Sequence, residues 1–539
     1  MNSDERTTLL TGGRVHTPSS PDATAMAITG DTVVWVGQDG PGRALHPDAE
    51  EIALDGAFVA PAFVDSHVHA TATGLHLSGL DLSAVRGGAE LLAAVRSAAR
   101  QGEVLLAHGW DSSTWEDARV PSRAELDQAA GDTPVYLSRV DVHSALVSTA
   151  MAELAPGTRS AEGWSDDGPL TRQAHHLVRA AARAAITPSQ RRAAQLAFLR
   201  TAAARGIATV HECAGPDISG VDDLTALLDL AEDPDLPAVV GYWGEIGAVD
   251  LAARLGLPGL AGDLFVDGSL GSHTAALCAT YTDLPHTAGA RYLDARTIAD
   301  HVVSCTEAGL QAGFHVIGDD AVGEVVRGFQ LAEQAIGSRA LAGRRHRLEH
   351  LEMIDAEQAR ILASWGVVAS VQPLFDAAWG GTSGMYAERL GAQRAGGLNP
   401  FSTLAAQGMP LALGSDAPVT PLDPWASVRA AVHHRTPGAG LSPRAAFTAH
   451  TRGGHRAAGT ADGTTGSLVP GAPAHYAIWA AANLVVAGSD ERVQRWSTDP
   501  RSGVPGLPAL EPGTDLPRCL RTVRAGRIIH DEFAVAGRA

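Results

Sequence analysis

The amino-acid sequence predicts an α/β protein built on a (β/α)8 TIM barrel. Across residues 58–457, short apolar runs alternate with stretches of helical periodicity, which is typical of parallel βα units. Eight such runs occur, and eight parallel strands close this type of barrel. The predicted strands cover residues 58–65, 205–211, 237–244, 262–267, 310–316, 346–350, 366–372 and 409–415.

Histidine and aspartate residues stand where several of these predicted strands end. His67 and His69 follow the apolar run 57–64, and because side chains alternate along a strand, both imidazoles point the same way and can reach one cation. His315, His350 and Asp416 end three later strands. Since the carboxyl ends of barrel strands meet on one face, the sequence predicts that these side chains converge there on a metal site.

Both ends of the chain are rich in short β-like runs punctuated by Gly and Asp, for example residues 32–37 and 519–529. We therefore expect one small β domain made from residues 1–57 together with residues 458–539. The barrel then occupies residues 58–457.

A long insertion separates the first two barrel strands, at about residues 70–204. Its own pattern predicts helices over 88–100 and 172–185 and strands over 104–111 and 134–139. An insertion of this length on the catalytic side would form a lid or a wall of the substrate pocket.

Composition narrows the class of protein. A formal net charge of −19 disfavours nucleic acid or an anionic membrane as a partner. No window approaches the ~18 uninterrupted apolar residues of a membrane span, and the first six residues lack the apolar core of a secretory signal. The four cysteines are widely spaced, as in reduced cytoplasmic proteins, so we expect a cytoplasmic protein. The chain contains no lysine, which excludes a Schiff base or a carbamylated lysine.

Taken in order, the motifs of this chain resemble those of the amidohydrolase superfamily, in the branch that includes N-substituted formamide deformylases. The resemblance covers nearly the whole chain. It implies a metal-dependent hydrolase whose barrel carries a β-sandwich built from both termini. The motifs are 65–69 (DSHVH), 108–111 (HGWD), 139–143 (RVDVH), 265–272 (FVDGSLGS), 315–319 (HVIGD), 346–350 (HRLEH), 370–373 (SVQP) and 414–418 (GSDAP).

By this resemblance, His67 and His69 bind one metal, His315 and His350 bind a second, and Asp416 binds metal while moving protons. The expected cofactor is one or two divalent ions, zinc first. In the family a lysine, usually carbamylated, bridges the two metals and stands four residues before an Asp-Gly pair. Here that position is Asp263. A carboxylate offers similar oxygens on a shorter arm, so Asp263 would bridge the metals, bind one of them, or hydrogen-bond a ligand histidine.

The predicted reaction is hydrolysis of an amide, N-formyl or cyclic amide C–N bond in a small molecule. A divalent ion lowers the pKa of bound water to ~7. Asp416 would accept a proton from this water and then donate it to the leaving nitrogen, while His350 or the metal polarises the carbonyl. Predicted substrate contacts are Trp110, Arg139, His143 and Gln372.

Two alternatives stay open at this point. The missing lysine also fits a deaminase or isomerase of the same superfamily with one metal, and a non-catalytic small-molecule-binding barrel is the third reading. The resemblance also suggests a homodimer. The adjacent pairs His175–His176 and His433–His434 are expected on solvated helix faces.

Overall fold

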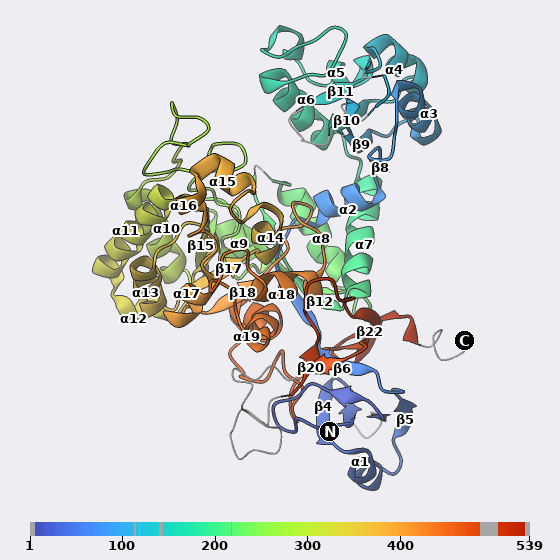
Figure 1. Cartoon of the computed structure of the whole chain (residues 1–539), viewed down its shortest axis with the longest axis vertical. Coiled ribbons are helices and arrows are strands. Elements are labelled where there is room, and N and C mark those ends of the chain that lie inside the picture. The colour runs from blue at the N-terminus through green and yellow to red at the C-terminus, as the bar shows by residue number, and fades with distance from the viewer. Residues whose placement is uncertain are drawn as a thin grey trace. The chain divides into compact units, whose positions relative to one another are not determined.

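The computed structural model describes residues 6–112, 115–117, 119–139, 144–216, 218–485 and 505–533. The chain folds as two compact units (Figure 1). One unit is Ala70–Phe198, and the other combines Met1–His69 with Leu199–Ala539. Each unit is described by itself below.

Parallel strands form the centre of the larger unit. They lie in two sheets, a three-stranded sheet in the order β13-β12-β7 and a five-stranded sheet in the order β14-β15-β16-β17-β18. Every ladder within these two sheets is parallel. The strands are β7 (Phe63–Val68), β12 (Ile207–Ala214), β13 (Ala238–Trp243), β14 (Gly259–Leu260), β15 (Gln311–Val316), β16 (Arg347–His350), β17 (Val368–Val371) and β18 (Leu411–Leu413).

The end of β18 lies against the end of β7 and joins the two sheets along one edge. An isolated parallel bridge pairs Val68 with Ala417, and the Asp416 amide donates to the His67 carbonyl at 2.8 Å. Gly414 permits this approach, because a Cβ at that position would lie 2.6 Å from the His67 nitrogen. Within the described residues no ladder joins β13 to β14.

Helices follow the parallel strands. In α11, buried Val322, Val325 and Phe329 recur every three or four residues, and Asp319 and Asp320 lie in the first turn, where the helix dipole favours negative charge. Helices α10 and α11 pack on each other in the yellow-green region of Figure 1. The helices of this unit are α1 (Asp39–Leu45), α8 (Val221–Ala231), α9 (Val249–Leu255), α10 (Ala295–Glu307), α11 (Asp319–Ile336), α12 (Ser338–Ala342), α13 (Ala356–Ser364), α14 (Pro373–Trp379), α15 (Met385–Leu390), α16 (Ala392–Ala395), α17 (Phe401–Ala406), α18 (Pro424–Val432), α19 (Pro443–Thr448) and α20 (Gly454–Ala457).

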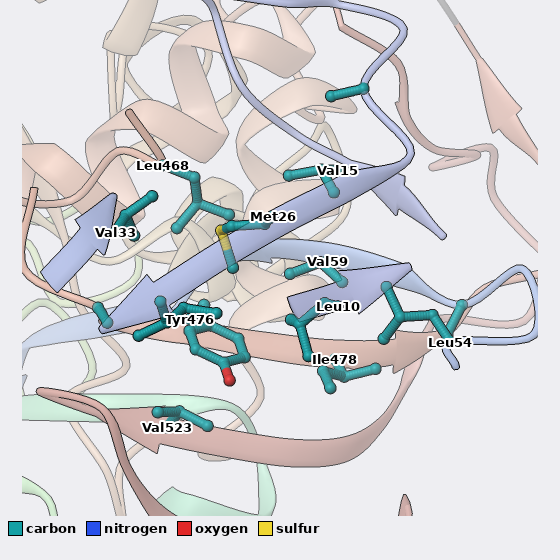
Figure 2. Packing of buried hydrophobic residues seen from close by; sticks show 14 of the residues in the cluster. Leu10, Val15, Met26, Val33, Leu54, Val59, Leu468, Tyr476, Ile478 and Val523 are labelled. Carbon is teal, nitrogen blue, oxygen red and sulfur yellow. The ribbon is translucent and has the colours of Figure 1, made fainter. Parts of the chain in front are cut away.

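Two further sheets bring the chain ends together: in Figure 1 the blue N-terminal strands lie beside the red C-terminal strands. Their orders are β4-β3-β1-β5 and β2-β6-β19-β22-β23. A shared core lies between them, with Leu10 and Met26 from the first sheet packed with Val59, Ile478 and Val523 from the second (Figure 2). The strands are β1 (Thr7–Thr11), β2 (Arg14–Val15), β3 (Ala25–Thr29), β4 (Thr32–Gly37), β5 (Glu50–Ala53), β6 (Phe58–Pro61), β19 (Tyr476–Ala480), β22 (Arg518–Arg524) and β23 (Arg527–Asp531); a separate pair joins β20 (Leu484–Val485) to β21 (Leu507–Pro508). The limits 1–57, 58–457 and 458–539 stay a prediction.

The predicted first strand, 58–65, is in fact two strands in different sheets. Its first half is β6, which pairs with β19, and its second half begins β7, which pairs with β12. The change of partner falls at Pro61 and Ala62: Pro61 has no N–H to donate, the Ala62 amide donates to His475, and the Phe63 amide donates to Gly206.

The predicted fourth strand, 262–267, is misplaced. The strand at that position in the order is β14, Gly259–Leu260, and the segment that follows makes only isolated bridges, between Phe265 and His315 and between Asp267 and Arg291. Gly262 has φ of +82°, outside the extended region, and therefore interrupts the strand.

The unit Ala70–Phe198 has a sheet of its own in the order β11-β10-β9-β8. The helices and strands predicted inside the insertion are present as α3, α6, β9 and β10. Its elements are α2 (Ala70–Ser78), β8 (Leu80–Asp81), α3 (Gly88–Ala98), β9 (Leu105–Trp110), α4 (Arg123–Ala130), β10 (Val135–Arg139), β11 (Ala145–Val147), α5 (Thr149–Glu153) and α6 (Arg172–Ala184), and α7 (Pro188–Ala204) continues into the other unit. Among all described residues, no helix is both long and apolar enough to cross a membrane.

Candidate metal centre

Six predicted metal ligands lie at the carboxyl ends of the parallel strands. Their side chains come from five places in the sheet order, and all are buried or nearly so. They are His67 on β7, His69 just after it, Asp263 after β14, His315 on β15, His350 at the end of β16 and Asp416 after β18.

The Asp263 carboxylate lies among the four histidines. Its Oδ1 is 3.5 Å from Nε2 of His67, 3.6 Å from Nδ1 of His315 and 4.0 Å from Nε2 of His350. Its Oδ2 is 3.2 Å from Nε2 of His69. Asp263 therefore belongs to two groups of mutually close ligand atoms, one with His67 and His69 and the other with His315 and His350.

Asp416 faces the same space from the opposite edge of the sheet. Its Oδ1 lies 3.1 Å from Nε2 of His69 and 3.6 Å from Nε2 of His67. With His67 and His350 it forms a further group whose ligand atoms all lie within 4.8 Å of one another.

Four buried atoms in this cluster have no hydrogen-bond partner in the described part of the chain: Nε2 of His67, Oδ1 of Asp263, Nδ1 of His315 and Oδ1 of Asp416. Burying polar atoms without partners is costly, by roughly 1–3 kcal/mol each. A cation among them satisfies all four at once, and imidazole nitrogens with carboxylate oxygens are the usual donors to divalent ions. The donor set therefore fits a divalent metal.

The other ring nitrogen of three histidines is held by a fixed acceptor. Nδ1 of His67 lies 2.9 Å from Oε2 of Glu349, and Nδ1 of His350 lies 2.8 Å from Oε1 of Gln372. Nε2 of His315 lies 3.3 Å from the Gly268 carbonyl oxygen. Since a carbonyl or carboxylate oxygen only accepts, the N–H of each ring points outward, which leaves the inward nitrogen to bind a cation once it has lost its proton.

Electrostatics favour the protonation states in which Asp263 and His350 can bind a metal ion. Burial alone would raise the pKa of the Asp263 carboxyl, but His67, His315 and His69 around it hold that pKa well below its usual range. Burial, together with the nearby His315 and His67, lowers the pKa of His350 to about 4. Asp263 is therefore an anion and His350 a neutral imidazole at pH 7.

Two of the six residues have left-handed backbone conformations, with φ of +71° at His350 and +54° at Asp416. Such conformations cost of order 1–3 kcal/mol in a non-glycine residue and concentrate at functional sites. Without the turn at His350, alternation along β16 would send Glu349 and His350 to opposite faces of the strand.

The four predicted substrate contacts lie in different surroundings. Gln372 is buried, and its Oε1 lies 2.8 Å from Nδ1 of His350. Trp110 is buried in the core of the Ala70–Phe198 unit, and its indole N–H donates to the Leu137 carbonyl at 2.9 Å. Arg139, in the same unit, pairs with Asp111 at 2.8 Å. His143 lies outside the described residues. The substrate-binding roles of all four stay predictions.

The sequence reasoning missed two residues that support the cluster, Arg347 and Glu349. Both are completely buried, and Nε of Arg347 donates to Oε1 of Glu349 at 2.6 Å. The signal was present: opposite charges two residues apart on a strand share a face, and on a buried strand that face is the interior.

Two expectations of solvated histidines were wrong. His175 is buried, with Nε2 2.8 Å from the Tyr136 hydroxyl. The side chain of His434 is buried as well, with Nε2 3.5 Å from Oδ1 of Asp376. In both cases a polar group from a distant segment lies next to the buried ring nitrogen.

Parallel strands whose carboxyl ends bring together buried histidines and carboxylates are the arrangement expected of a metal-dependent hydrolase. A family model described as the Amidohydrolase family matches residues 50–530, and the chain belongs to this family. The predicted superfamily is thereby confirmed.

Relatives of known sequence and structure agree with this assignment. Protein LONG AFTER FAR-RED 3 of Arabidopsis thaliana is 30% identical over 519 residues, covering 87% of this chain and 86% of the relative. N-substituted formamide deformylase of Arthrobacter pascens is 23% identical over 472 residues, covering 79% of this chain and 83% of the relative. The crystal structure of an uncharacterised metal-dependent hydrolase from Pyrococcus furiosus has a TM-score of 0.75 and 27% identity, and the match covers 88% of this chain and 98% of that structure.

Proposed function

We propose that this protein hydrolyses a non-peptide C–N bond, in an amide, an N-formyl group or a cyclic amide of a small molecule. The observation that carries the proposal is the convergence of four histidines and two carboxylates on one space, with four of their buried atoms lacking any described hydrogen-bond partner. The similarity to N-substituted formamide deformylase supports the choice of bond.

His67, His69, Asp263, His315, His350 and Asp416 are the residues that would hold the ion or ions, with zinc as the first candidate. When bound, a divalent ion supplies Lewis acidity, which makes water nucleophilic at neutral pH and polarises a carbonyl. Asp263 is the residue shared by the two histidine groups, so its negative charge compensates cations in either half.

Asp416 is the proposed proton carrier. Its carboxylate lies where β18 and β7 end. Burial raises the pKa of this carboxyl, but His67, His69 and His350 around it hold that pKa below its ordinary value, so the group is an anion that can accept a proton. In the first half of the reaction Asp416 Oδ1 takes a proton from the attacking water. In the second half it returns this proton to the leaving nitrogen, so that the amine departs neutral. His350 donates Nδ1–H to Gln372 and turns its Nε2 lone pair towards the cluster, so it would act on the carbonyl oxygen only through the ion that it helps to hold.

A substrate panel on the purified, metal-loaded protein tests the proposal. N-formyl amines, linear amides and cyclic amides are each incubated, and formate, amine, carboxylate and ammonia are measured. We expect carboxylate or formate with an amine as products. Asp416→Asn should lower kcat by at least about 100-fold, the lower end of general acid–base effects, with an unchanged unfolding temperature. Release of ammonia alone would point to a deaminase, and near-normal turnover of the variant would refute the role of Asp416.

A further inference from the structure

Among the described residues, a single arginine is completely buried, next to the candidate metal centre. The Arg347 guanidinium is 0% exposed and is surrounded by partners from several strands. Each partner restricts a different part of the group: Oε1 of Glu349 at 2.6 Å from Nε, the Ser66 carbonyl at 2.7 Å and Oγ of Ser370 at 3.1 Å from Nη2, Nδ1 of His211 at 3.1 Å from Nη1, and the ring of Tyr242 at 4.3 Å.

Glu349 connects this arginine to one metal ligand. Its Oε1 accepts from Nε of Arg347 at 2.6 Å, and its Oε2 accepts both from Nη2 of Arg347 at 3.1 Å and from Nδ1–H of His67 at 2.9 Å. Because the ring of His67 is fixed through Nδ1, its Nε2 faces Asp263 at 3.5 Å and Asp416 at 3.6 Å. The arginine also fixes the backbone next to His67, through the Ser66 carbonyl.

Two other ligand histidines, His350 and His315, have different supports. His350 is held by Gln372, and His315 is held by the Gly268 carbonyl. The centre therefore has separate supports for separate ligands.

We propose that Arg347 and Glu349 are positioning residues that act on metal binding through His67, and not through His315. This inference rests on the proposed function, since it concerns the same metal centre. An outer carboxylate on a ligand histidine typically contributes 10–100-fold to metal affinity. If the Arg347–Glu349 pair were purely structural, its loss would lower the free energy of unfolding and leave zinc affinity unchanged.

A double-mutant cycle separates the two roles. Metal-free wild type, Glu349→Gln, His67→Asn, His315→Asn and the two pairwise combinations with Glu349→Gln are titrated with Zn²⁺ alone against a chromophoric chelator. We expect Glu349→Gln to weaken zinc binding 10–100-fold in the wild type and in the His315→Asn background. In the His67→Asn background, Glu349→Gln should weaken zinc binding by less than about twofold, because the ligand through which Glu349 acts is gone.

Two further variants keep the test independent of folding. Glu352→Gln, the same substitution at another buried carboxyl three residues along the chain, should leave zinc affinity within twofold. Arg347→Met leaves the Glu349 carboxylate buried without its cation and should lower the unfolding temperature. Arg347→Met with Glu349→Gln should recover much of that temperature while zinc binding stays weak.

Full additivity of Glu349→Gln with His67→Asn would overturn the inference, and so would unchanged zinc affinity in Glu349→Gln. Either result leaves the proposed function standing if the wild type still binds metal and hydrolyses its substrate. Conversely, the cycle could show the expected coupling while the wild-type protein, loaded with metal, hydrolyses no C–N bond. That result would refute the proposed function alone.

Discussion

Oδ2 of Asp263 lies 3.2 Å from Nε2 of His69, while Oδ1 of the same carboxylate faces His67, His315 and His350. One short side chain thus contacts both halves of the candidate metal centre. This arrangement makes Asp263 the residue whose loss should affect the metal content most widely.

Asp263→Asn should lower the number of bound divalent ions or weaken their binding at least 10-fold, because a neutral amide oxygen is a poorer ligand than a carboxylate. Metal per protein is measured by emission spectroscopy after dialysis against a fixed free-zinc concentration. Asp355→Asn is the control, since Asp355 caps α13 and asparagine is an equally good cap. Equal metal content in Asp263→Asn and wild type would remove Asp263 from the centre.

Bicarbonate should have no effect on recovery of activity. The chain has no lysine, so no lysine carbamate can form and the proposed ligand set needs no carbon dioxide. Metal-free protein is reloaded with zinc in degassed buffer and in buffer with added bicarbonate, and the recovered rates are compared. A rate that rises with bicarbonate would show that a ligand other than these side chains is needed.

Stability should fall on the acid side partly because of His346. Burial, with His301 and Arg344, lowers the pKa of His346 to about 3, and its Nδ1 accepts the Ala312 N–H at 2.9 Å. Between this value and the ordinary 6.5, the unfolded chain takes up a proton that the folded protein does not. The stabilisation is therefore complete above about pH 6.5 and decreases as the pH falls towards 3, by up to ~1.4 kcal/mol per pH unit.

His346→Asn removes this titration and should flatten the acid side of the stability profile. Urea unfolding of both proteins at pH 7.5, 6 and 5 measures the slope. Asn keeps an acceptor for the Ala312 amide, so the comparison concerns the proton and not the lost hydrogen bond alone. Identical slopes in the two proteins would show that His346 is not the group responsible.

Ile478→Ala should cost about 2–5 kcal/mol of stability, because Ile478 is fully buried between the two terminal sheets and pairs with Val59 (Figure 2). Chemical unfolding measures the loss. Ile528→Ala on β23 is the matched control: its side chain is 47% exposed, and the change should stay within ~0.5 kcal/mol. Equal losses in the two variants would contradict this account of the core.

The sequence predicted the parts of the site that depend on local order. His67 and His69 share a strand face, and His315, His350 and Asp416 each follow an apolar run, so their strand-end positions could be inferred before any tertiary contact was known. Asp263 was identified only through its spacing from the Asp-Gly pair.

What escaped prediction depends on partners from distant segments. Arg347 is satisfied by Ser66, His211 and Ser370, and no periodicity within 346–350 indicates those contacts. His175 and His434 were expected in solvent because adjacency on a helix says nothing of Tyr136 or Asp376. The fourth strand was misplaced because an apolar run resembles a strand even where a glycine turns the backbone away.

The crossing at Pro61 and Ala62 has a practical consequence for anyone who wishes to exchange the terminal sheets for those of a relative. The polypeptide passes from Phe58 in one sheet to His67 in another without an intervening loop. A chimera joined at Pro61 and Ala62 would alter the backbone position and the strand register of β7, the segment that carries His67. Chimeras should therefore be joined upstream, in the turn at Asp55 and Gly56, where both residues already have positive φ and no strand is severed.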